Sequence, residues 1–433
     1  MRIRFYHARI MTMEENVPLF WGEIHICGDR IERILRDDKN AEISAAGAGS
    51  NGRWDLEIDC RGNLLMPGFK NAHTHSPMTF LRSYADDLPL QEWLSQKVFP
   101  IEAKLDEECI YAFGRLAILE YLSSGITSIF DMYIMPDVMA KVCMDSGMRC
   151  VLVSGLNDFT SSLRKQEEEF LKWNQESPLI SYRMGCHAQY TTSEELLKGL
   201  AKLASKYQAP VYLHLSETQK EVEDCLGKTG KTPVKYLDDL GLFQYGGGGY
   251  HCIYLTEEEF DIFEKRGMSA VTNPSSNLKL ASGIAPMAEF LKRKINTAIG
   301  TDGAASNNCL DMFREMFLVT GLSKIRERDA ACMDAGEVLK MATIGGAKAM
   351  GLPDADILAP GKLADLIMID LSQPNMQPIH NIPKNLVYSG SKANVKMTMI
   401  GGRILYMDGR YDIGRDPEEI YEICAKQLAK LFQ

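Results

Sequence analysis

The alternation of hydrophobic and polar positions changes twice along the chain. Residues 1 to about 62 contain short segments in which apolar and polar residues alternate, such as Gly22–Ile26, with turn residues between them. Strict alternation is typical of a β-strand with one buried face. We therefore expect short strands and turns here. The small and polar residues Ala41–Gly52 predict a loop or a partly disordered segment.

From about residue 64 to 350, apolar runs of strand length alternate with helical segments. Eight strands are predicted: Phe69–His75, Ile126–Asp131, Arg149–Ser154, Ile180–His187, Pro210–His214, Gly249–Ile253, Ala270–Asn273 and Thr297–Asp302. Helices predicted between them include Glu107–Ser123, Ser193–Tyr207 and Ala285–Lys292. Eight β–α units in about 280 residues predict an α/β fold, a (β/α)8 TIM-type barrel. A doubly wound open sheet is the alternative.

After about residue 355, short strand-like segments return. Met397–Tyr406 predicts a hairpin around Gly401 and Gly402. Asp416 followed by Pro417 predicts the start of a last helix, which ends near Leu431. Neither strand-rich end has much core alone, so we expect both ends to form one small β-sandwich domain. The predicted parts are residues 1–63 and 356–433 of the β-sandwich, with the barrel at residues 64–355.

Composition excludes several classes of protein. A hydrophobic content of 45% and a charged content of 24% are ordinary for a soluble globular protein. The net charge of -10 argues against a nucleic-acid partner. No apolar run reaches the roughly 18 residues of a membrane span, and the N-terminus lacks the apolar core of a signal peptide. We therefore expect no membrane partner and a cytoplasmic location, and a homo-oligomer stays open.

The cysteines point to the same compartment. Eleven cysteines are scattered along the chain without a Cys-x-x-Cys pair, which indicates reduced thiols in the cytosol. The missing pair also excludes the zinc deaminases that hold their metal through a Pro-Cys-x-x-Cys signature. Four consecutive glycines, Gly246–Gly249, predict a loop before a strand. They lack the strand–loop–helix context of a phosphate cradle, so we assign them no ligand.

The candidate chemistry lies at the ends of the predicted strands. His73 and His75 stand two residues apart in one strand, so both side chains point to the same face and can hold one cation. Alone, such a pair can equally be a polar face. Five of the eight histidines, however, fall at or near strand ends: His73, His75, His187, His214 and His251. With Asp302 they supply enough ligands for one catalytic divalent metal. In a barrel, but not in an open sheet, these strand ends converge.

The motifs resemble those of one known family. They are Met66-Pro-Gly-Phe-Lys-Asn-Ala-His-Thr-His, Tyr84-Ala-Asp-Asp-Leu-Pro-Leu-Gln-Glu-Trp-Leu, Pro100-Ile-Glu-Ala-Lys-Leu, His214-Leu-Ser-Glu-Thr, Asn273-Pro-Ser-Ser-Asn-Leu-Lys-Leu and Gly300-Thr-Asp-Gly-Ala-Ala-Ser-Asn-Asn. In this order they resemble the amidohydrolase superfamily. Within it, the likeness is to the 5'-methylthioadenosine/S-adenosylhomocysteine deaminase group, which is related to the triazine chlorohydrolases. The resemblance spans nearly the whole chain.

The resemblance implies a role for each site residue. His73, His75, His214 and Asp302 would hold one divalent metal, and the resemblance implies Zn²⁺. Such a metal lowers the pKa of its water to about 7. Glu217 would carry a proton to the purine ring nitrogen. Asp302 would pass the water proton to the leaving amino group, and His251 would hydrogen-bond the attacking hydroxide. Apart from the resemblance, Glu217 can be a loop carboxylate, Asp302 a turn residue and His251 a core histidine.

The resemblance also implies a nucleoside substrate. Glu102 would accept hydrogen bonds from the ribose hydroxyls, and His187 would also contact the nucleoside. Relatives often carry an arginine before a Gly-Leu at the end of the third strand, which meets the polar tail of the substrate. Ser154 stands there in this chain. This weakens the case for S-adenosylhomocysteine and favours methylthioadenosine, adenosine or 5'-deoxyadenosine, unless Arg149 or a neighbouring subunit supplies the charge.

We thus expect hydrolytic deamination of an adenosine-type nucleoside to the inosine analogue and ammonia. A guanine or other aminopurine deaminase and a triazine chlorohydrolase are alternatives on the same scaffold. A non-catalytic scaffold protein or a metal-binding module without turnover are alternatives of another class. Non-catalytic relatives typically lose ligands, and none is lost here.

Overall fold

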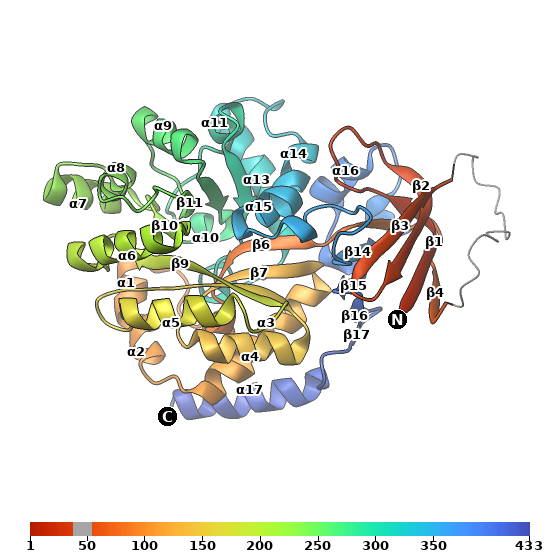
Figure 1. The fold of residues 1–433 in the computed structure, drawn as a ribbon, viewed down its shortest axis with the longest axis horizontal. Coiled ribbons are helices and arrows are strands. Elements are labelled where there is room, and N and C mark those ends of the chain that lie inside the picture. The colour runs from red at the N-terminus through yellow and green to blue at the C-terminus, as the bar shows by residue number, and fades with distance from the viewer. Residues whose placement is uncertain (38–53) are drawn as a thin grey trace.

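The computed structural model describes residues 1–37 and 54–433, so the predicted loop Ala41–Gly52 lies outside the described residues. Eight of the described strands form one parallel sheet in chain order (Figure 1). They are β6 (Phe69–Thr74), β7 (Ile126–Met132), β8 (Arg149–Val153), β9 (Ile180–Ala188), β10 (Val211–Leu215), β11 (Gly247–His251), β12 (Ser269–Thr272) and β13 (Asn296–Ile299). Each overlaps a predicted strand, and the order confirms the predicted (β/α)8 barrel.

The residues after β13 close the barrel against β6. The backbone N–H of Asp302 donates to the carbonyl of His73 at 3.0 Å, and the N–H of Thr301 donates to Asn71 Oδ1 at 2.8 Å. Gly300 makes this approach sterically allowed, because a Cβ there would lie 2.8 Å from the Cβ of His73. Closure therefore brings the ends of the first and last strands together.

Helices connect and cover the barrel strands. They are α1 (Leu90–Trp93), α2 (Phe99–Glu102), α3 (Glu107–Ser123), α4 (Pro136–Ser146), α5 (Leu163–Trp173), α6 (Glu194–Tyr207), α7 (Gln219–Thr229), α8 (Pro233–Asp239), α9 (Glu257–Arg266), α10 (Pro274–Lys279), α11 (Met287–Lys292), α12 (Ala304–Asn307), α13 (Met312–Glu327), α14 (Ala335–Lys340) and α15 (Gly346–Met350). Short 3-10 or π turns are η1 (Ser76–Leu81), η2 (Leu94–Val98) and η3 (Met341–Gly345). Helix α3 has the predicted bounds. It begins after Asp106, whose side chain accepts the N–H of Cys109 at 2.9 Å.

Both chain ends build a second sheet beside the barrel, as predicted (Figure 1). Its strands are β1 (Arg2–Ile10), β2 (Phe20–Cys27), β3 (Arg30–Arg36), β4 (Leu56–Asp59), β5 (Leu64–Pro67), β14 (Leu366–Ile369), β15 (Val395–Ile400), β16 (Arg403–Met407) and β17 (Arg410–Tyr411). The hairpin between β15 and β16 turns at Gly401 and Gly402, which both have positive φ. A core of its own, including Phe5, Ile24 and Met397, joins the two chain ends.

The remaining elements precede, join or follow the C-terminal strands of the second sheet. They are η4 (Pro353–Ala355), η5 (Pro374–Met376), α16 (Ile382–Lys384), η6 (Asn385–Ser389), η7 (Lys392–Asn394) and the last helix α17 (Pro417–Leu431), which packs on α3. Helix α17 starts after Asp416 and ends at Leu431, as the sequence predicts.

Two details differ from the prediction. Strand β5, assigned above to the barrel, pairs with β1 and β14 and so belongs to the second sheet. Its partner β14 lies about 300 residues away in sequence, so no local pattern reveals the pairing. Gly247 and Gly248, expected in a loop, belong to β11, which therefore begins two residues before the predicted strand; a Cβ on Gly247 would lie 2.0 Å from the carbonyl oxygen of Val211.

No helix of the described residues is long and apolar enough to cross a membrane. All eleven cysteines carry free thiols. These free thiols agree with the reduced cysteines expected from the scattered cysteine positions.

Candidate functional site

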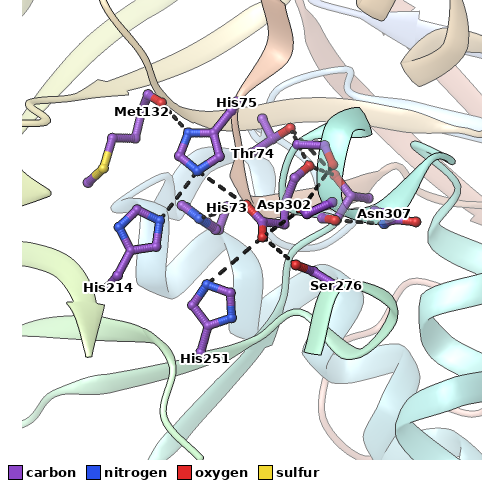
Figure 2. A network of polar contacts seen from close by, with 12 residues as sticks. His73, Thr74, His75, Met132, His214, His251, Ser276, Asp302 and Asn307 are labelled. Atoms are coloured by element: carbon purple, nitrogen blue, oxygen red, sulfur yellow. Dashed lines mark hydrogen bonds and ion pairs between the residues drawn. The ribbon is translucent and has the colours of Figure 1, made fainter. Parts of the chain in front are cut away.

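Side chains from four barrel strands converge at the carboxyl ends of the strands (Figure 2). Ligand atoms of His73, His214, His251 and Asp302 all lie within 4.8 Å of one another, and the four side chains are buried. His75 joins them, because its Nε2 lies 3.2 Å from Asp302 Oδ1 and 3.3 Å from His214 Nε2. All the residues predicted to hold a metal are therefore brought together.

The strand and a stacked tyrosine position the first histidine pair, His73 and His75. The ring of His73 stacks on Tyr250 with centroids 3.7 Å apart. Between the two histidines, Thr74 points to the other face, where its hydroxyl lies 2.7 Å from the hydroxyl of Tyr121. This alternation follows from the strand, and it leaves both imidazoles on the inner face of the barrel.

The hydrogen bonds of the outer ring nitrogens show that the site fits a cation. His214 Nδ1 donates to the carbonyl of His187 at 2.7 Å, and His75 Nδ1 contacts the carbonyl of Met132. In a neutral ring the Nε2 atom then carries a lone pair. Two such lone pairs face each other across 3.3 Å, and both nitrogens of buried His73 lack a hydrogen-bond partner among the described residues. A divalent metal at this point satisfies all three rings.

The pKa values of two of the three rings, His73 and His214, agree with this fit. Burial lowers the pKa of His73 to about 3 and that of His214 well below its ordinary value, so both rings are neutral at pH 7, as a ligand must be. Burial also lowers the pKa of His75, but Asp302 outweighs it and raises this pKa to about 9, so His75 has to give up a proton when it binds a metal. The group as a whole is a site for a divalent metal.

Asp302 is oriented through its second oxygen. Oδ1 faces His73 and His75 at 3.4 and 3.2 Å, whereas Oδ2 accepts hydrogen bonds from Ser276 at 2.6 Å and Ser306 at 3.0 Å. Burial alone would raise the pKa of Asp302, but the two imidazoles hold it well below its usual range. Asp302 has a positive φ of 58°, so it is a strained residue held by its surroundings.

Glu217 lies just beyond β10 and faces the same space. Its Oε1 accepts a hydrogen bond from Ser282 at 3.1 Å and lies 3.9 Å from His251 Nδ1. Burial raises the pKa of Glu217. Its backbone N–H and that of Ser216 donate to the carboxylate of Glu221 at 2.8 and 2.9 Å. Glu217 is therefore a fixed carboxyl group that binds a proton more readily than an exposed one.

His251 is held by the helix that follows the next strand. Its Nδ1 lies 2.6 Å from Asn277 Oδ1, and because an amide oxygen can only accept, His251 donates this bond. Its Nε2 is then a hydrogen-bond acceptor and lies 4.0 Å from Asp302 Oδ2.

The two residues expected to contact the nucleoside also lie at this end of the barrel. Glu102, the last residue of α2, accepts a hydrogen bond from the Tyr133 hydroxyl at 2.7 Å, and burial raises its pKa. The ring of His187 lies 4.8 Å from that of His214, and its Nδ1 lies 3.0 Å from the hydroxyl of Thr191.

The contacts of the third barrel strand, β8, show whether Arg149 can supply the positive charge that is absent at Ser154. Arg149 begins β8, and Ser154 follows its other end. The guanidinium of Arg149 is buried in an ion pair with Asp365, at 2.6 and 3.0 Å, and also donates to the carbonyl of Pro178. Arg149 therefore does not supply the charge that Ser154 lacks.

Several residues of the site have no assigned role in the sequence analysis. Tyr133, Ser276, Asn277, Ser282 and Ser306 position the residues named above. Ser276, Asn277 and Ser306 lie in motifs that carry the family resemblance, so their segments could have been singled out. Their individual contacts arise only when α10 and α12 fold over the end of β13.

Comparison with known proteins decides the family. The model of the amidohydrolase family matches residues 64–405. The chain belongs to the amidohydrolase family. It is 40% identical to a 5'-deoxyadenosine deaminase of Methanothermobacter thermautotrophicus, over 92% of this chain and 94% of the relative. It is 38% identical to a 5-methylthioadenosine/S-adenosylhomocysteine deaminase of Pelotomaculum thermopropionicum, over 98% and 97%.

A solved structure supports the same family. An adenosine deaminase of Xanthomonas campestris with bound zinc superposes with a TM-score of 0.91 at 33% identity, over 100% of this chain and 98% of that one. The family expected from the motifs is therefore confirmed, and with it the barrel architecture and the presence of a divalent-metal site.

Proposed function

We propose that this amidohydrolase removes the 6-amino group of an adenosine-type nucleoside and releases ammonia and the inosine analogue. The observation that carries the proposal is the position of Glu217: a buried carboxyl group with a raised pKa lies 3.9 Å from His251, beside the metal-ligating group. Hydrolysis of an aromatic amidine needs such a proton donor for the ring nitrogen. The names of the two relatives and of the zinc-bound neighbour support this reaction.

The proposed metal is Zn²⁺, held by His73, His75, His214 and Asp302. Nitrogen ligands with a carboxylate suit zinc, and the bound zinc of the Xanthomonas campestris neighbour supports this identity. When bound, the metal supplies a nucleophile at neutral pH, because it lowers the pKa of a coordinated water to about 7.

The protein residues then move the protons. Protonated Glu217 donates to the purine ring nitrogen, which makes the adjacent carbon electrophilic. Asp302 accepts a proton from the water and delivers it to the departing amino group. His251, whose Nδ1 is bound to Asn277, orients the attacking water through Nε2. The two serine bonds to Asp302 Oδ2 keep its other oxygen directed at the reacting centre.

Glu102 and His187 would bind the sugar. A carboxylate can accept two hydrogen bonds from a vicinal diol, and the contact with Tyr133 engages only Oε1 of Glu102. His187 lies beside His214 and is neutral at pH 7, because burial lowers its pKa to about 4. A neutral imidazole can donate or accept a hydrogen bond with a sugar hydroxyl.

The 5' substituent is proposed to be small and uncharged. Ser154 is buried, and its hydroxyl oxygen accepts the N–H of Leu156 at 3.1 Å. With Arg149 engaged by Asp365, neither residue of this strand offers a cation for an amino-acid tail. 5'-Deoxyadenosine, methylthioadenosine and adenosine are therefore proposed ahead of S-adenosylhomocysteine.

One experiment tests the proposal against its alternatives. Ammonia release is measured for the zinc-loaded protein with 5'-deoxyadenosine, methylthioadenosine, adenosine, S-adenosylhomocysteine, guanine and an aminotriazine. We expect the first three to have the highest kcat/KM. A preference for guanine or the triazine would replace the nucleoside proposal, and no turnover of any compound by metal-loaded protein would contradict it.

A further inference from the structure

A second cavity lies at the other end of the barrel. It has a volume of about 240 Å³, and residues of β9, β10, β11, β12 and α15 line it. Arg183, Pro210 and Gly247 at this cavity each stand four residues before His187, His214 and His251 of the catalytic end. Four strand residues span roughly 13 Å, so the cavity is separate from the metal site.

Three cationic side chains line this cavity: Arg183, Arg266 and Lys348. Arg266 is neutralised by Asp238, with contacts of 2.7 and 3.2 Å. Neither Arg183 nor Lys348 forms an ion pair with any residue in the described parts of the chain, 1–37 and 54–433. Two positive charges therefore face one cavity in a protein with a net charge of -10.

Arg183 is partly buried, so the absence of a counter-ion is energetically unfavourable for it. Its one hydrogen bond among the described residues runs from Nη2 to the carbonyl of Gly351 at 3.3 Å. A Cβ on Gly351 would lie 1.9 Å from Arg183 Nη2, so glycine is what allows the guanidinium to lie on the backbone. Burial lowers the pKa of Arg183. A partly desolvated cation without an anion is unfavourable, and an anion in the cavity would relieve this.

The rest of the lining leaves room for such a group. The hydroxyl of Tyr212 is already engaged, since it donates to the carbonyl of Ala349 at 2.6 Å. Ser269 also lines the cavity, and its Oγ accepts a hydrogen bond from Asn296 at 3.0 Å. Tyr245 also lines the cavity and is 36% exposed.

We propose that this cavity binds a phosphate group, with Arg183 and Lys348 as its charge partners. A phosphate dianion matches the two unpaired charges, and its oxygens suit the planar guanidinium. The phosphate can be inorganic or can belong to a nucleotide whose base stacks on Tyr245. The site is independent of the deaminase proposal, because it shares no residue with the metal centre.

The test uses the intact zinc-loaded protein. Inorganic phosphate is titrated at constant ionic strength, with sodium chloride as the balancing salt, and the melting temperature is followed. A ligand of the folded state gives a rise that grows with the logarithm of its concentration above Kd, on the order of 2 °C at tenfold excess over Kd. We expect this rise in the native protein and its loss in Lys348→Ala and in Arg183→Gln.

Matched controls separate the cavity from other phosphate effects. Arg164→Gln removes an exposed arginine whose one ion-pair partner among the described residues is Glu168, and it should keep the full rise. A full rise retained in Lys348→Ala would overturn the proposal, as would a rise no larger than that of chloride. Lys348 is exposed, so this variant tests the site even if Arg183→Gln does not fold.

A second arm identifies the source of the phosphate. Uridine monophosphate carries the same group on a base that has no amino group to hydrolyse. A larger rise than with inorganic phosphate, reduced by Tyr245→Ala, assigns the site to nucleotides. Equal rises, both lost in Lys348→Ala, assign it to inorganic phosphate.

Discussion

The hydroxyl of Tyr133 donates a 2.7 Å hydrogen bond to Oε1 of Glu102, and this bond ties the short helix α2 to the metal-ligating end of the barrel. The ring of Tyr133 lies 6.3 Å from that of His75, between centroids. Burial raises the pKa of Glu102, while the Tyr133 bond and the nearby His75 act against it. The position of the Glu102 carboxyl group is therefore fixed by Tyr133.

Replacement of Glu102 by alanine should lower kcat/KM for nucleosides far more than for free bases. A hydrogen bond to a charged group contributes about 1.5–3 kcal/mol, which corresponds to one to two orders of magnitude in kcat/KM. Free adenine, if it reacts, should lose little. Comparing kcat/KM for both substrates checks this, with Glu92→Ala, an exposed acid in α1, as control. Equal losses for both classes would remove the ribose role.

Replacement of Tyr133 by phenylalanine should also lower kcat/KM for nucleosides more than for free bases, but by a smaller factor than Glu102→Ala. The variant keeps the ring beside His75 and removes only the hydroxyl that orients Glu102. We expect a several-fold loss in kcat/KM for nucleosides, mainly through KM, and an unchanged metal content. A loss of metal would show instead that Tyr133 supports His75.

Much of this site could be predicted because its residues lie at the ends of strands. The apolar runs before His73, His214, His251 and Asp302 are recognisable locally, and a barrel brings their ends together. Pairings across long sequence distances could not be predicted. The Arg149–Asp365 ion pair joins residues 216 positions apart, and it decides that Arg149 is absent from the substrate pocket. Strand β5 likewise joins the second sheet through β14, which no local pattern indicates.

Removal of one imidazole should remove the metal. His73 is fully buried with both nitrogens unpartnered among the described residues, so His73→Ala leaves an incomplete ligand set. Elemental analysis should find one divalent metal per chain in the native protein and less than a tenth of that in the variant. His7→Ala is the control, because His7 lies in β1 beside Asp59. Two metals per native chain would contradict the single-metal site.

Glu217→Gln should abolish deamination and leave the metal bound. A glutamine keeps the size of the side chain and its contact with Ser282, but it cannot donate a proton to the ring nitrogen. Loss of general acid–base catalysis is worth roughly 10²–10⁴-fold in kcat. Turnover and metal content are measured together, with Glu223→Gln, an exposed residue of α7, as control. Near-native turnover would refute the role of Glu217.

The stability of the fold should depend on pH through Glu315. This buried residue of α13 accepts hydrogen bonds from the N–H of Ser275 at 3.0 Å and from Asn307 at 2.9 Å, and burial raises its pKa from 4.5 to about 7. The folded state therefore keeps a proton that the unfolded chain loses. Its contribution to the free energy of unfolding is complete below pH 4.5 and is lost as the pH rises to about 7. The loss is about 3 kcal/mol.

Urea unfolding at pH 5 and pH 8 should show this difference in the free energy of unfolding. We expect the difference to be reduced in Glu315→Gln and unchanged in Glu327→Gln, at the exposed end of the same helix. An equal pH dependence in both variants would mean that Glu315 is ionised in the folded protein.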